Sequence, residues 1–139
     1  MNGPPGLYAS GGVLVETSAL VAIILEEQDW QALAQAMALS ACTTSVFNVF
    51  EASLAVASRK AVAVGEANAL VMSLAEEFAV VIVPLTPDMI PHAIAARERY
   101  GRGRNGLNMG DCLSYAAAKA LGLKLLYKGD DFSATDVND

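Results

Sequence analysis

Histidine and cysteine are scarce in this sequence, which excludes several kinds of site. There is one histidine, His92, and there are two cysteines, Cys42 and Cys112, without a C-x-x-C pair. These residues supply too few ligands for a zinc site, and their spacing is not that of a disulfide framework. Catalysis of the Ser-His-Asp or Cys-His type would depend on His92 alone. A phosphate-binding loop of the form G-x-x-x-x-G-K-S/T is also missing.

Basic residues and long apolar runs are also in short supply. Nine Lys and Arg face fifteen Asp and Glu, for a net charge of −6, so a generally basic nucleic-acid-binding surface is excluded. The apolar run from Val13 to Leu25 is interrupted by Glu16 and is shorter than the ~18 residues that a membrane span requires. The N-terminus lacks the basic start of a secretory signal. We therefore expect a soluble cytoplasmic protein that makes no membrane contact.

Length and composition predict one globular domain. The chain has 139 residues, of which 54% are hydrophobic and 17% charged, so it is not a disordered protein. Residues 1–12 (MNGPPGLYASGG) are rich in Gly and Pro and show no periodicity. We expect 1–12 to be a loose N-terminal extension and 13–139 to be the folded domain.

Short apolar runs alternate with helical patterns along the chain. Strands are predicted at 13–15, 41–44, 80–83 and 123–127. Helices are predicted at 19–27 with Ser18 as N-cap, from 29 onward, and at 45–60, 66–78, 86–100 and 110–121. This alternation predicts an α/β fold with α/β/α layers around a short, mostly parallel sheet.

Several acidic residues follow the predicted strands in the sequence. A parallel sheet binds its ligands beyond the carboxyl ends of its strands, which is where these residues would lie. Glu16 follows the first predicted strand, and Asp130 and Asp131 follow the last. Glu51 lies in the helix after the second strand, and Asp111 begins a helix after a loop. We expect these five carboxylates to converge on one pocket.

Converging carboxylates repel one another, and a divalent cation removes the repulsion. Ligands that are all oxygen favour Mg²⁺ or Mn²⁺ over zinc. Such an ion can polarise a phosphoryl oxygen and generate hydroxide, which suits phosphodiester hydrolysis. The prediction is a Mg²⁺- or Mn²⁺-dependent hydrolase.

The few basic residues are concentrated near the C-terminus. Seven of the nine lie after residue 96. A basic rim beside an acidic metal pocket would suit a polyanion. Arg102, Arg104 and Lys128 are the candidates for contacting the phosphates of such a polyanion.

Three segments give the chain a resemblance to the PIN-domain ribonucleases, specifically the VapC-type toxins of prokaryotic toxin–antitoxin pairs. They are VETSAL at 15–20, LNMGDC at 107–112 and LLYKGDDF at 125–132, together with Glu51 in its apolar helix. The resemblance covers about residues 13 to 137.

This resemblance implies a PIN-like fold and a metal-dependent endoribonuclease toxin that cleaves tRNA or rRNA. It implies that the metal is held by Glu16, Glu51, Asp111 and the Asp130/Asp131 pair, whose closer member stays open. It also implies a homodimer and neutralisation by a VapB-type antitoxin. DNA would be contacted only indirectly, through that antitoxin.

One residue departs from the family pattern. The first acidic position is normally aspartate and here is Glu16. A carboxylate that is one methylene longer weakens activity if it misplaces a ligand by ~1 Å. Glu16 therefore leaves open a catalytically silent binding module that retains antitoxin and dimer contacts. A second alternative is a receiver-like phospho-acceptor switch, which Lys128 after the last strand would suit but which lacks paired acids directly after the first strand.

Overall fold

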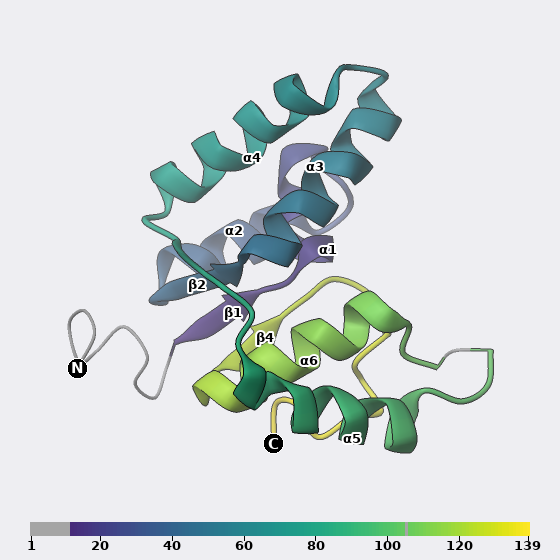
Figure 1. Cartoon of the computed structure of the whole chain (residues 1–139). Helices are drawn as coiled ribbons and strands as arrows, with labels where there is room; N and C mark the ends of the chain where they lie inside the picture. The colour runs from purple at the N-terminus through teal and green to yellow at the C-terminus, as the bar shows by residue number, and fades with distance from the viewer. Residues whose placement is uncertain (1–11, 105) are drawn as a thin grey trace.

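The computed structural model describes residues 12–104 and 106–139, and their strands form one parallel sheet (Figure 1). The strands are β1 (Val13–Val15), β2 (Cys42–Ser45), β3 (Val81–Val83) and β4 (Lys124–Leu126), in the order β3-β2-β1-β4. β1 lies between β2 and β4 and pairs in parallel with both. The carboxyl ends of all four strands therefore meet at one edge. Apart from Gly12, the expected extension lies outside the described residues.

Helices cover both faces of this sheet (Figure 1). On one side lie α1 (Thr17–Ile24), α2 (Trp30–Ala38), α3 (Val46–Lys60) and α4 (Val64–Glu77). On the other side lie α5 (Ile90–Tyr100) and α6 (Met109–Leu121), with a short 3-10 helix, η2 (Pro87–Met89), before α5. This arrangement confirms the predicted α/β/α layers.

The central strand supplies side chains to both layers of the core. Val15 is fully buried in the cluster that includes Val56 of α3 and Val71 of α4. Its neighbour Leu14 is fully buried in the other cluster, with Ala116 of α6. Successive side chains of a strand point to opposite faces, so three apolar residues are enough to anchor two helical layers.

Two predicted helix starts were wrong in detail. Glu16, not Ser18, is the N-cap of α1, because its carboxylate accepts a hydrogen bond from the Ser18 backbone N–H at 3.0 Å. The segment from Thr86 begins with η2, and the α-helix starts only at Ile90. Pro91 has no N–H to donate, which fits the first turn of a helix and not its interior.

None of the helices within the described ranges is both long and apolar enough to cross a membrane.

Candidate active site

Four of the five predicted acidic residues line one pocket beyond the carboxyl ends of β1 and β4. The pocket has a volume of about 300 Å³, and its walls include Glu16, Glu51, Asp111 and Asp131. These residues come from four segments that are distant in the sequence, and the parallel sheet and its helices bring them together. The convergence expected from the strand ends is thus present in the structure.

Asp130 and Asp131 differ in their position relative to this pocket. Both follow β4, and the turn between them and the strand contains Gly129, which has a φ of 93°. Both residues are exposed, but Asp131 lines the pocket and Asp130 is not part of its wall. The geometry therefore favours Asp131 as the pocket carboxylate.

Glu16 is the most buried carboxylate of the group, with 5% of its surface exposed. Its Oε1 accepts hydrogen bonds from both the backbone N–H and the hydroxyl of Ser18. Burial raises the pKa of Glu16 to about 7, the Ser18 hydrogen bonds oppose this rise, and the charges of Asp111 and Glu51 add to it. Glu16 thus carries an electrostatic cost that a nearby cation would relieve.

Asp111 and Glu51 meet at the N-terminus of α6. Asp111 is in a capping box: its carboxylate accepts a hydrogen bond from the Asn108 N–H at 3.1 Å, while the Asn108 side chain accepts one from the Asp111 N–H. Burial raises the pKa of Asp111, the Asn108 hydrogen bond lowers it, and the charges of Asp131 and Glu51 raise it further.

Gly110 leaves room for the Glu51 carboxylate at this helix end. A Cβ on Gly110 would lie 2.8 Å from Glu51 Oε2 and 3.1 Å from Cζ of Phe47. No side chain other than hydrogen would therefore fit at Gly110 without moving Glu51. The close approach of Glu51 to the α6 backbone places its carboxylate beside Asp111.

The chemistry of these donors fits a hard divalent cation. The pocket offers carboxylate oxygens and the hydroxyl groups of Thr17 and Ser18, and no sulfur or imidazole. Burial, and to a smaller extent the charges of neighbouring carboxylates, raise the pKa values of Glu16 and Asp111. Within residues 12–104 and 106–139, however, no three His, Cys, Asp or Glu side chains are close enough to hold a metal ion. The carboxylates share a pocket without forming a finished coordination shell.

Two basic side chains, Lys128 and Arg59, lie at the rim of the pocket and form ion pairs with Glu27, an acidic residue outside the predicted set. Glu27 lines the pocket and pairs with Lys128 at 3.1 Å and with Arg59. Burial pushes the pKa of Glu27 upward, but hydrogen bonds and charges from Lys128 and Arg59 outweigh it and hold that pKa below its usual value. The Lys128 backbone N–H also donates to the Ser18 hydroxyl at 2.9 Å, which ties the loop after β4 to α1.

The basic residues expected at the site are only partly near it. Lys128 reaches the rim through Glu27, whereas Arg102 and Arg104 are exposed in the segment between α5 and α6 and do not line the pocket. Arg59, at the end of α3, lines the pocket and was not among the predicted residues. No sequence pattern marks Arg59, because only the packing of α3 against α1 brings it to Glu27.

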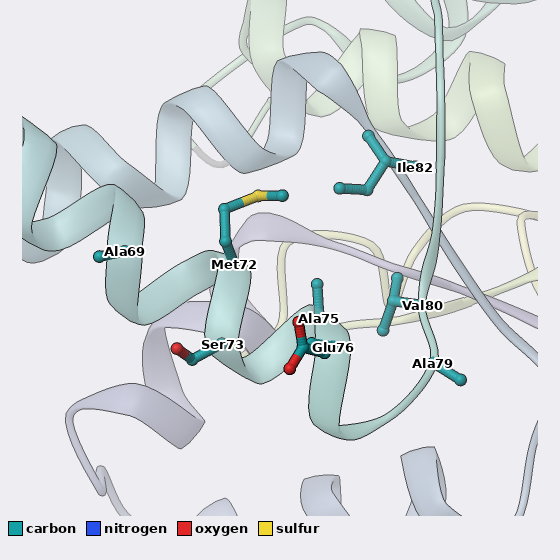
Figure 2. Close-up of a pocket in the computed structure, with 8 residues that line it drawn as sticks. All are labelled: Ala69, Met72, Ser73, Ala75, Glu76, Ala79, Val80 and Ile82. Carbon is teal, nitrogen blue, oxygen red and sulfur yellow. The ribbon is translucent and has the colours of Figure 1, made fainter.

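A larger cavity elsewhere lacks the groups for chemistry. It has a volume of about 600 Å³ and lies between α4 and the edge strand β3 (Figure 2). Met72, Val80 and Ile82 contribute apolar surface, and Glu76 is the one ionisable residue among those that line it. This cavity carries no cluster comparable to the carboxylate pocket.

A family model and several curated proteins match most of the chain. A family model described as a PIN domain matches residues 13–138. The chain is 39% identical over 129 residues to a protein named Ribonuclease VapC from Mycolicibacterium smegmatis, covering 90% of this chain and 97% of the other. It is 36% identical over 131 residues to Ribonuclease VapC30 from Mycobacterium tuberculosis, covering 90% of this chain and 95% of the other.

A solved structure has the same fold. It is the crystal structure of Mycobacterium tuberculosis VapC20, described as a toxin that cleaves the sarcin–ricin loop. The TM-score is 0.71, and the match covers 91% of this chain and 96% of that one, at 18% sequence identity. At this identity the likeness shows the fold.

Proposed function

The chain belongs to the PIN-domain family of VapC ribonucleases, and from that premise we propose that it is a toxin whose endoribonuclease activity depends on Mg²⁺ or Mn²⁺. Its substrate is tRNA or rRNA, and it acts in the cytoplasm, where these RNAs are found. The observation that carries the proposal is the convergence of four carboxylates from separate segments on one pocket.

Glu16, Glu51, Asp111 and Asp131 are the residues that would hold the cation, with Asp131 preferred to Asp130. When bound, the ion supplies Lewis-acid activation of the phosphodiester and lowers the pKa of a water molecule. The chain itself brings the carboxylates together and orients them. Glu16 is fixed by Ser18, and Asp111 is fixed by the capping box with Asn108.

The cations at the rim have a separate task, which is to bring RNA to an acidic pocket. The pocket carboxylates would repel a phosphate, and Arg59 and Lys128 offset that repulsion at the side where Glu27 holds them. Arg102 and Arg104 would extend this contact along the RNA backbone.

An antitoxin of the VapB type is the proposed protein partner. Val46, Phe50 and Leu54 form an exposed apolar stripe on α3, with exposures of 57%, 58% and 43%. Glu51, on the same helix, lines the pocket, so this stripe runs beside the carboxylates. A peptide with apolar side chains and one inward-pointing cation would match both surfaces and block the site. Homodimer formation belongs to the same proposal, with DNA contacted only through the antitoxin.

A specific observation favours one alternative, the catalytically silent binding module. Glu16 replaces the aspartate of the family pattern, and its carboxylate is committed to Ser18. A catalytically silent module that only binds antitoxin would tolerate that change. The receiver-like alternative has no comparable support, because the family match spans residues 13–138.

The experiment is incubation of total RNA with the free protein, with and without Mn²⁺, followed by mapping of new RNA ends. We expect Mn²⁺-dependent cleavage at a small number of sites in tRNA or rRNA. Cleavage should disappear in Asp111→Asn, which keeps the size of the side chain and removes its charge. Absence of new ends at every metal concentration, with normal antitoxin binding, would favour the silent module.

A further inference from the structure

A network of buried polar side chains joins the segments that carry the pocket carboxylates. Its centre is Asn48, which is 0% exposed and lies in the first turn of α3. The Asn48 side-chain amide donates one hydrogen bond to Oγ1 of Thr17 and one to Oγ of Ser114, each at 3.0 Å. Ser114 is 1% exposed, and neither Asn48 nor Ser114 lines the pocket.

The orientation of the Asn48 amide is determined by Ser45, the N-cap of α3. The Ser45 hydroxyl accepts the Asn48 backbone N–H at 3.0 Å, so its own proton is free to donate to Asn48 Oδ1 at 2.7 Å. The carbonyl end of the amide therefore faces Ser45, and both N–H groups face Thr17 and Ser114. The side chains of serine and threonine have a single O–H donor and an ionised aspartate has none, so none of them could make both contacts.

Each of the three residues that Asn48 joins, including Asn48 itself, lies close in the sequence to one pocket carboxylate. Thr17 is adjacent to Glu16. Asn48 precedes Glu51 by three residues in α3, and Ser114 follows Asp111 by three residues in α6. Residues three apart on a helix lie on one side of it. The network thus joins the start of α1, the first turn of α3 and the first turns of α6.

These three segments need such a restraint. Carboxylates that share one pocket repel one another, and the repulsion acts to separate the elements that carry them. Apolar packing alone has no fixed direction, whereas a satisfied buried hydrogen-bond network specifies one arrangement. The segments joined by Asn48 are those that carry Glu16, Glu51 and Asp111.

We propose that Asn48 and Ser114 are positioning residues, which hold the segments bearing Glu16, Glu51 and Asp111 together around the pocket, so that their carboxylates can close on a divalent cation. This inference rests on the proposed function, and it deepens that function by assigning a role to residues outside the pocket.

The test compares Ser114→Ala with Ser53→Ala in the full chain. Ser53 is a matched control: it is 1% exposed, donates to the Val49 carbonyl at 2.8 Å and accepts from Asn68 at 3.2 Å, within the α3 and α4 layer. Mn²⁺ affinity is measured by titration calorimetry, and stability is measured by urea unfolding in EDTA. We expect both variants to remain folded, with Mn²⁺ bound at least ~10-fold more weakly by Ser114→Ala and unchanged in Ser53→Ala.

Asn48→Ala is the second variant, and it should weaken Mn²⁺ binding more than Ser114→Ala does, because it removes both contacts at once. Wild-type affinity in folded Ser114→Ala would overturn the positioning role even if Asn48→Ala fails to fold. Wild-type protein that binds no Mn²⁺ would overturn the proposed metal dependence together with the positioning role. Mn²⁺ binding that all variants retain at full strength would overturn the positioning role alone.

Discussion

Replacing Gly110 by alanine should impair the active site while leaving the fold intact. Gly110 is the second residue of α6, and an added Cβ would lie 2.8 Å from Glu51 Oε2. Carbon–oxygen contacts relax to about 3.4 Å, so the Glu51 carboxylate has to withdraw by about 0.6 Å. Misplacement by ~1 Å in an active site costs about 100-fold in rate, and we therefore expect a rate roughly 10- to 100-fold lower.

The stability of the same variant should change little. Alanine is favoured over glycine in a helix by about 1 kcal/mol, which offsets the cost of moving the Phe47 ring from its 3.1 Å contact. We expect the free energy of unfolding in urea to stay within about 1 kcal/mol of the wild-type value.

Gly65 provides the matched control for this experiment. It is the second residue of α4, as Gly110 is of α6, and a Cβ added there meets nothing within 4 Å. Gly65→Ala should therefore keep the wild-type cleavage rate and gain up to about 1 kcal/mol in stability. The assay is the initial rate of Mn²⁺-dependent RNA cleavage. A folded Gly110→Ala variant that cleaves at the wild-type rate would refute the argument that Gly110 makes room for the Glu51 carboxylate.

Four further predictions concern the charges of the site. Asp111→Asn should reduce cleavage at least ~1,000-fold with an unchanged circular dichroism spectrum; full activity in a metal-dependent assay would refute the assignment of Asp111. Glu16→Asp should raise the cleavage rate by about 10- to 100-fold, because it restores the family's shorter side chain; no gain would contradict the proposed attenuation. In EDTA, stability should fall by about 3 kcal/mol between pH 4.5 and pH 7, because burial first, and then neighbouring charges, raise the pKa of Glu16 from 4.5 to about 7 in the folded protein. Urea unfolding across this range checks the sign, and the fall should be clearly smaller in Glu16→Gln; an equal fall in that variant would contradict the assignment to Glu16. Arg59→Ala and Lys128→Ala should each raise KM more than they lower kcat, and should reduce the salt dependence of log KM by about one phosphate contact; an unchanged salt slope would exclude them from RNA binding.

Much of the fold could be predicted, because short apolar runs and helix ends are local signals. A helix was expected to begin at residue 45, and Ser45 is the N-cap of α3; the helix expected at 110–121 does end at residue 121, followed by Gly122 with a left-handed φ of 68°. The N-cap of α1 was missed because Ser is a far more common N-cap than Glu. The N-cap role of Glu16 is visible only in the structure, where its buried carboxylate accepts the Ser18 backbone N–H.

The candidate site was predictable to the extent that it follows from topology. Carboxyl ends of parallel strands meet at one edge, so Glu16 and the acids after β4 had to lie near one another. The choice between Asp130 and Asp131 depends on the path of a turn and needed coordinates. Arg59 and Asn48 were missed because their partners are 32 and 66 residues away in the sequence, and no local pattern connects them.

The central claim is that Glu16, Glu51, Asp111 and Asp131 together hold a divalent cation. The most direct test is a crystal structure of the protein grown with Mn²⁺, with anomalous scattering recorded at the manganese edge. The account predicts an anomalous peak in this pocket, bound by carboxylate oxygens from at least three of these four residues and lost in Asp111→Asn. A peak at another location, or an Mn²⁺-saturated crystal with no peak between these side chains, would contradict it.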